Sequence, residues 1–116
     1  MNVHSQIVTL NDENFHELVL NQKTLCLVDF WADWCGPCRT MGPFIDRLAA
    51  EFTGDIRVAK LNVDENPKTA NDLQIRSLPT LILFHGEEII FEIVGTPNPQ
   101  SLIDQMEKAI ETHGKN

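Results

Sequence analysis

Two cysteines at close spacing are the residues best suited to chemistry. The segment WADWCGPCRT, residues 31–40, places Cys35 and Cys38 three positions apart, with a glycine and a proline between them. Thiols at this spacing can supply half of a structural zinc site, form a structural disulfide, or cycle between dithiol and disulfide. The remainder of the sequence discriminates among these uses.

Neither a zinc site nor a disulfide framework is favoured. A structural zinc site needs four converging ligands, but the third cysteine, Cys26, falls in a predicted central strand, and the four histidines form no pair at ligand spacing. Three cysteines is also an odd number for a disulfide framework. We therefore expect redox chemistry from the pair, no metal, and a core-packing role for Cys26.

Redox cycling requires one reactive thiol and a second thiol within reach. Cys35 falls where a buried strand ends and a helix begins, so unpaired backbone N–H groups and the helix dipole should favour an accessible thiolate. Cys38 falls in the first turn of that helix, within disulfide distance. Reactive groups in open α/β sheets lie at the carboxyl ends of strands, and the motif follows such an end.

The elements that position the pair follow from the hydrophobic pattern. Apolar runs predict strands, and apolar residues at helical intervals predict helices. Strands are expected at 3–9, 24–32, 56–63, 81–84 and 89–94, and helices behind Asn11, from the motif to Phe52, at 66–73 and at 99–112. Asn11 and Asn66 are the expected N-caps, and Pro43 should kink the second helix.

The order βαβαβαββα predicts an α/β protein. Helices between strands imply parallel crossovers, and a hairpin at HGEE, residues 85–88, implies an antiparallel edge. We expect a central five-stranded mixed sheet with helices on both faces. A chain of 116 residues has room for one core, so a single domain over residues 1–116 is expected.

Composition argues against several classes of function. A formal net charge of −8 argues against a nucleic-acid surface, which would need clustered Lys and Arg. No uninterrupted apolar stretch reaches the roughly 20 residues of a membrane-spanning helix. The N-terminus lacks the basic-then-apolar pattern of a signal peptide and the arginine richness of a transit peptide, so the expected location is the cytoplasm, and the expected state is a monomer.

Several segments together resemble one protein family. DFWADWCGPC, residues 29–38, resembles the active-site segment of thioredoxins, and VAKLNVDENP (58–67), IRSLPTLILF (75–84), Gly86 and Gly95 match the family in order and spacing. A lone CxxC pair is a weak signal, whereas this set covers nearly the whole chain and is highly specific. The resemblance implies a thioredoxin fold and protein-disulfide reductase activity.

The resemblance also implies roles for residues near the pair. Cys35 would be the attacking nucleophile and Cys38 the resolving thiol. Asp29 would move a proton to or from Cys38, with Lys60 close to it. Asp29 also interrupts an apolar run, and burial there would raise its pKa toward the range that a proton carrier needs.

Other positions match the family's substrate-facing and supporting residues. Pro79 matches a cis-proline that packs beside the disulfide, and Trp34, on the loop before the helix, is expected to be exposed. The expected substrate-binding residues are Trp34, Gly36, Pro37, Leu78, Pro79 and Gly95, and the expected supporting residues are Trp31 and Pro43. The proline-rich segment TPNPQ, residues 96–100, departs from the family pattern and should stiffen the rim of the site.

The same resemblance implies how the electrons travel. No cofactor would be bound; electrons would come from NADPH through a flavoprotein thioredoxin reductase and pass to client proteins with disulfides. The Gly36-Pro37 pair is associated with the reducing members of the family. Two rival functions stay open: a disulfide oxidase or isomerase, and a binding subunit that uses the same fold without redox chemistry.

Overall fold

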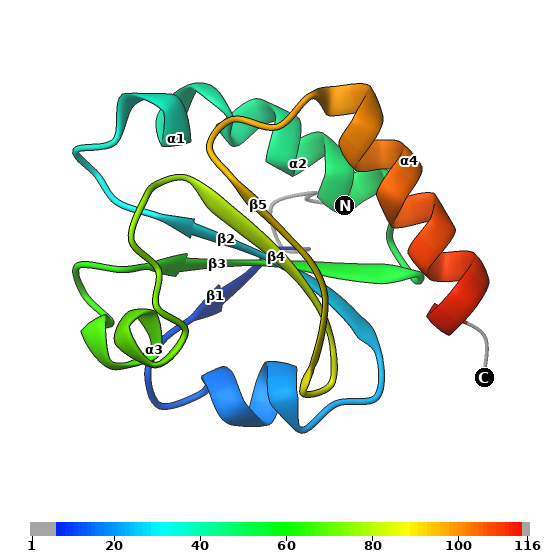
Figure 1. Ribbon diagram of the computed structural model, residues 1–116, viewed down its shortest axis with the longest axis horizontal. Helices are drawn as coiled ribbons and strands as arrows, with labels where there is room; N and C mark the ends of the chain where they lie inside the picture. Colours follow the sequence, from blue (N-terminus) through cyan, green and yellow to red (C-terminus); the bar gives the residue numbers. More distant parts are fainter. Residues whose placement is uncertain (1–6, 115–116) are drawn as a thin grey trace.

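The computed structural model describes residues 7–114 and is built around one mixed sheet. The strands are β1 (Ile7–Leu10), β2 (Leu25–Trp31), β3 (Ile56–Asn62), β4 (Thr80–His85) and β5 (Glu88–Val94). Their order is β1-β3-β2-β4-β5, in which β1, β3 and β2 run parallel and β4 and β5 pair antiparallel (Figure 1). This confirms the predicted five-stranded α/β sheet; residues 3–6 of the first predicted strand lie outside the described part.

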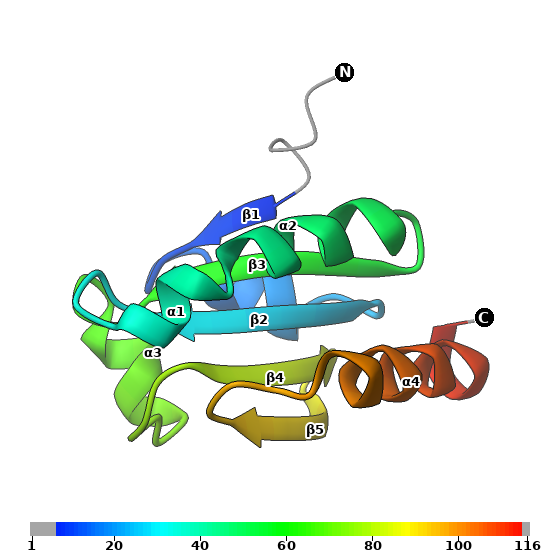
Figure 2. The ribbon, with the colours of Figure 1, turned by 90° about the horizontal axis from the view of Figure 1, so that it is seen from above.

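Helices cover both faces of the sheet. They are α1 (Gly36–Thr40), α2 (Gly42–Glu51), α3 (Pro67–Asp72) and α4 (Pro99–Ala109), with short π-helical segments η2 (His16–Leu20) and η3 (Ile110–Gly114). The helices α2 and α4 lie on one face, whereas η2 and α3 lie on the other (Figures 1 and 2). Within residues 7–114, no helix combines the length and the apolar character needed to cross a membrane.

Strand β2 lies at the centre of the sheet and is buried on both faces. Leu25 and Leu27 belong to the core cluster under α2 and α4, whereas Val28 and Phe30 belong to the cluster on the side of η2. Alternate side chains of a strand point to opposite faces, so a continuous apolar run is what such a strand requires. The carboxyl end of β2 is therefore held firmly beneath the segment that carries the cysteines.

The helix after the cysteine motif is interrupted, as Pro43 predicted. Helix α1 ends at Thr40 and α2 begins at Gly42, with Met41 between them. Pro43 has no N–H for the carbonyl of Arg39, and its ring crowds that carbonyl. The break separates a short helix that carries Cys38 from a longer one that packs against the sheet.

Candidate active site

The cysteine pair lies beyond the carboxyl end of β2, as predicted. Cys35 occupies the N-cap position of α1, and a disulfide joins it to Cys38, with the two Cα atoms 5.3 Å apart. The backbone N–H of Cys38 donates a hydrogen bond to Sγ of Cys35 at 3.2 Å. In the reduced protein, a donor at this position would stabilise negative charge on the Cys35 sulfur.

Both cysteines are buried, although the sequence predicted that Cys35 would be accessible. Cys35 is only 3% exposed and Cys38 4%, whereas an accessible Cys35 was expected. The backbone N–H of Cys35 donates to the carbonyl of Ala32 at 3.1 Å, which folds the loop tightly against the end of β2. Only a small part of the disulfide is therefore open to a partner.

Trp34 supplies a large exposed apolar surface directly before Cys35. Its side chain is 68% exposed, as expected for this loop, and its indole Nε1 donates to Oδ2 of Asp64 at 2.9 Å. An aromatic ring fixed at the surface by one hydrogen bond is well suited to contact a partner. Asp64 was not predicted, because nothing in its own segment indicates that it meets Trp34.

Asp29 is a buried carboxyl in β2, as the sequence predicted. It is 2% exposed, and Oδ1 has no hydrogen-bond partner among the described residues. Burial raises its pKa from the ordinary 3.8 to about 6, and the positive charge of Lys60 opposes part of this rise. Lys60, which is half-buried, pairs with Asp29 across β2 and β3. A carboxyl of this pKa can accept or release a proton near neutral pH.

The start of β4 and the end of β5 lie beside the carboxyl end of β2. Phe30 pairs with Thr80, and Thr80 pairs with Val94, so Pro79 and Gly95 reach the same end of the sheet as the cysteines. The Leu78–Pro79 peptide bond is cis, as the resemblance implied. The backbone N–H of Gly95 donates to the carbonyl of Pro79 at 2.8 Å.

Glycine is required at position 95 by the backbone conformation. Its φ of +89° is rarely adopted by residues with a side chain, yet a Cβ there would meet no atom within 4 Å. The space beside Gly95 is therefore open, and the requirement comes from the turn.

The other predicted residues surround the pair at different depths. Gly36 and Pro37 are exposed at the start of α1, and Leu78 is half-buried before the cis-proline. Trp31 is half-buried at the end of β2, and Pro43 is exposed in the first turn of α2.

An apolar hollow of about 530 Å³ adjoins α1. Its lining residues are Pro37, Thr40, Met41, Phe44, Thr96, Pro97 and Pro99. Pro37 and the proline-rich segment were predicted from the sequence to belong to the rim of the site. Met41 and Phe44 were assigned only to the core-facing side of the helix, because periodicity does not show where a helix face passes the edge of the core.

The comparisons with known proteins agree with this architecture. The family model for thioredoxin matches residues 6–108. The thioredoxin of Buchnera aphidicola subsp. Schizaphis graminum is 41% identical over 92% of this chain and 99% of its own length. The chloroplastic thioredoxin M-type of Pisum sativum is 43% identical over 91% of this chain and 62% of its own length. Thioredoxin 2 of Chlorobaculum tepidum is 49% identical over 72% of this chain and 77% of its own length.

The mixed sheet with helices on both faces is the thioredoxin fold that the resemblance implied, and it carries a cysteine pair at the spacing the family uses. Family match and close relatives cover most of the chain. The chain belongs to the thioredoxin family and is a thiol-disulfide oxidoreductase.

Proposed function

We propose that this chain reduces disulfides in client proteins. The observation that carries the proposal is the Cys35–Cys38 disulfide at the end of a buried strand, with the Cys38 N–H directed at the Cys35 sulfur. A thiol stabilised as its thiolate attacks disulfides more readily, and a second thiol in the same helical turn can complete the exchange.

The proposed reaction has two exchange steps. The Cys35 thiolate attacks one sulfur of a client disulfide, forming a mixed disulfide and releasing the other client sulfur as a thiolate. The Cys38 thiolate then attacks the Cys35 sulfur, which forms the Cys35–Cys38 disulfide and releases the second client thiolate. The two electrons that reduce the client come from the dithiol, which is oxidised.

Asp29 is the proposed proton acceptor for Cys38. Cys38 must lose its proton before it can attack, and a buried carboxylate with a pKa of about 6 can take that proton near neutral pH. Lys60 is the proposed modulator of this step, since its charge lowers the pKa of Asp29 and so favours the carboxylate form that accepts the proton.

The proposed client surface is the rim around the disulfide. It comprises Trp34, Gly36, Pro37, Leu78, Pro79 and Gly95. The exposed indole of Trp34 and the open space beside Gly95 support this assignment. Trp31 and Pro43 are proposed to hold the cysteine loop and the helix break in shape.

The remaining parts of the proposal concern the electron donor and the setting. We propose that a flavoprotein thioredoxin reductase returns electrons from NADPH to the Cys35–Cys38 disulfide. The chain would act as a monomeric single domain, residues 1–116, in the cytoplasm, where thiols are kept reduced. Fractionation of the source cells and size-exclusion chromatography test these last points.

Reduction of insulin disulfides tests the proposal directly. The protein should accelerate insulin precipitation in the presence of dithiothreitol, and should also turn over with NADPH and a thioredoxin reductase. Cys35→Ser should remove both activities, whereas Cys26→Ser serves as the matched cysteine control and should keep them. Equal activity in the Cys35→Ser variant would refute the proposal.

Three further measurements separate the cysteine roles and the rival functions. Cys38→Ser should accumulate mixed disulfides through Cys35, and their absence from a treated lysate would contradict the assigned order of attack. The reduction potential should fall near the value of about −270 mV that is typical of thioredoxin. A much higher potential would favour an oxidase or isomerase, and full biological function in Cys35→Ser, Cys38→Ser would favour a binding subunit.

A further inference from the structure

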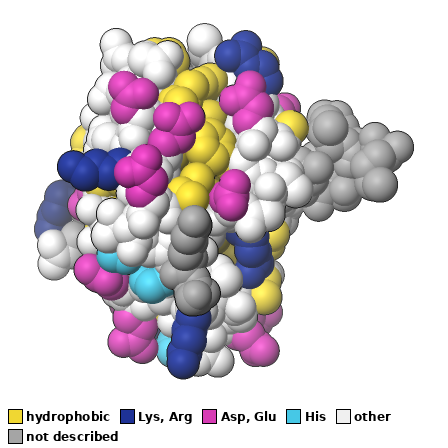
Figure 3. Space-filling view, turned by 90° about the vertical axis from the view of Figure 1, so that its right-hand side faces the viewer, with side chains coloured by type: hydrophobic (Ala, Val, Ile, Leu, Met, Phe, Trp, Pro, Cys, Tyr) yellow, Lys and Arg dark blue, Asp and Glu magenta, His cyan; other side chains and the backbone are white. Residues whose placement is uncertain are grey.

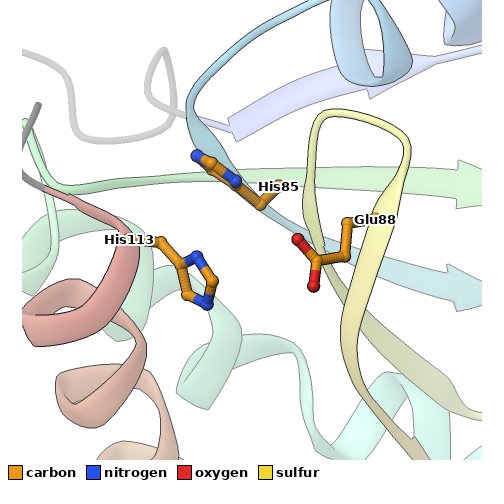
Figure 4. Close-up of side chains that lie close together, drawn as sticks. All are labelled: His85, Glu88 and His113. Carbon is orange, nitrogen blue, oxygen red and sulfur yellow. The ribbon is translucent and has the colours of Figure 1, made fainter.

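Two histidines and a glutamate converge at the end of the sheet opposite the cysteine pair. His85 ends β4, Glu88 begins β5, and His113 lies in η3. Their donor atoms, the imidazole nitrogens and a carboxylate oxygen, all lie within 4.8 Å of one another. In Figure 4 the side chains of Glu88 and His113 point toward each other, with the ring of His85 beside them. His85 pairs with Leu25 at the start of β2, whereas the cysteines follow its end.

The backbone around this cluster is held in place by the fold. His85 and Glu88 are cross-strand partners at the β4–β5 hairpin. Gly86 makes the tight turn possible, because its φ is +61° and a Cβ there would come within 2.9 Å of the Gln22 carbonyl oxygen.

The C-terminal segment η3 packs against the start of β2. A Cβ built on Gly114 would lie 3.8 Å from Cδ1 of Leu25. This packing brings the ring of His113 to 5.0 Å from the ring of His85, measured between centroids. The ligand-bearing positions are therefore fixed by elements far apart in the sequence.

The donor atoms of the cluster are available to a ligand. Glu88 is exposed and both histidines are half-buried. Over residues 7–114, no hydrogen bond or ion pair engages these three side chains. Figure 3 shows histidine rings at the surface, with acidic side chains nearby, on the side of the molecule that it displays. The chain also carries a formal net charge of −8, which favours the binding of a cation over that of an anion.

We propose that His85, Glu88 and His113 form a binding site for a Zn²⁺ ion. Two imidazoles and one carboxylate, with a water as fourth ligand, are a donor set that zinc binds in four-coordinate geometry. Bonds of about 2.0–2.2 Å place tetrahedral ligands about 3.3–3.6 Å apart, so the donor atoms must approach by up to about 1.5 Å. Rotation of the exposed Glu88 side chain and of the two rings supplies this movement. Magnesium and calcium prefer all-oxygen sites and fit the cluster poorly.

The bound ion would connect η3 to the β4–β5 hairpin. An ion that binds only the folded chain stabilises it by mass action. This function is separate from disulfide exchange, since the cluster and the cysteine pair lie at opposite ends of β2.

Calorimetric titration with zinc chloride tests the site. The oxidised protein is used, because the reduced thiols of Cys35 and Cys38 would bind zinc themselves. One ion should bind per chain, and His85→Gln or His113→Gln should each weaken binding by more than about tenfold. His16→Gln, an exposed histidine on η2, and His4→Gln, outside the described residues, are matched controls that should leave the affinity unchanged.

Thermal unfolding gives a second measurement. Saturating zinc should raise the melting temperature of the oxidised parent by about 5–10 °C and should leave that of His113→Gln unchanged. Equal melting temperatures of the parent and the variant without zinc would show that the variant folds. Absence of saturable binding, binding that survives both His85→Gln and His113→Gln, or loss of binding in either control would overturn the proposal. None of these outcomes bears on insulin reduction.

Discussion

Asp29 is a buried carboxyl whose ionisation opposes folding. Its pKa is about 6 in the folded chain, because burial disfavours the charge, against an ordinary value of 3.8. Between these pH values the folded chain binds more protons than the unfolded chain, so the free energy of unfolding falls as pH rises through this window. The difference between the two pKa values lowers the free energy of unfolding by about 3 kcal/mol, and this loss persists at higher pH.

Asp29→Asn should remove this loss, because an amide does not ionise. At pH 8 the variant should be more stable than the parent by up to about 3 kcal/mol, and at pH 3.5 the two should be similar. Guanidinium denaturation at both pH values measures this. Asp55→Asn, at an exposed position, is the control and should change little at either pH. A gain that is equal at both pH values would show that ionisation is not its source.

Cys26 is a thiol that burial keeps protonated. It is 1% exposed, and burial raises its pKa to about 11, with the charge of Arg57 opposing part of the rise. Because only a thiolate reacts with alkylating reagents, iodoacetamide at pH 8 should modify Cys35 in the reduced, folded protein far faster than Cys26. Mass spectrometry of the peptides measures both rates. All cysteines should react in denaturant, and rapid labelling of Cys26 in the folded protein would contradict its core role.

Helix α3 is capped by a residue distant in the sequence. The carboxylate of Asp12 accepts hydrogen bonds from the backbone N–H of Lys68 at 3.2 Å, the backbone N–H of Thr69 at 2.8 Å and the hydroxyl of Thr69 at 2.7 Å. Asn66, the cap that the sequence predicted, occupies the N-cap position but makes no capping bond with its side chain. Its amide instead donates to the carbonyl of Asn62.

Asp12→Ala should lower the melting temperature, because the first turn of α3 would lose its acceptors. Hydrogen bonds from Thr69 hold the pKa of Asp12 below its usual range. The ionised Asp12 carboxylate therefore stabilises the folded chain at pH values above the pKa that Asp12 has in the unfolded chain, and this stabilisation is lost as pH falls through the lower pKa of the folded chain. The deficit of the variant should therefore shrink in acid. Melting curves at several pH values measure it, and Glu13→Ala, which removes the same charge from the same loop, should have a much smaller effect. Equal effects would indicate that only net charge matters.

The hydrophobic pattern predicted helices and strands that can be recognised from their own residues. It did not predict side-chain contacts between segments distant in the sequence. The central strand was expected at 24–32 and is found at Leu25–Trp31, because burial on both faces leaves a clear apolar run. The Asp12 cap and the Trp34–Asp64 hydrogen bond were not predicted. In both cases the partner lies in another segment, whose own periodicity contains no information about the contact.

At the scale of the whole molecule, the core is independent of the redox pair. Two clusters of buried side chains, one on each face of the sheet, include neither Cys35 nor Cys38. Both cysteines lie beyond the end of β2, where α1 begins. The packing within these two clusters therefore does not run through the disulfide, and we expect the pair to open and close during exchange without disturbing it.

Reduction should consequently weaken the protein only modestly. The disulfide joins residues three apart in the sequence. Closing so short a loop lowers the entropy of the unfolded chain and thereby stabilises the folded chain by about 2 kcal/mol. Guanidinium denaturation of the oxidised and reduced forms should give cooperative transitions in both, separated by roughly that amount. The Cys35→Ser, Cys38→Ser variant is the matched control, since its stability should not respond to reductant. Loss of the cooperative transition on reduction would mean that the disulfide, and not the two-sided core, maintains the fold.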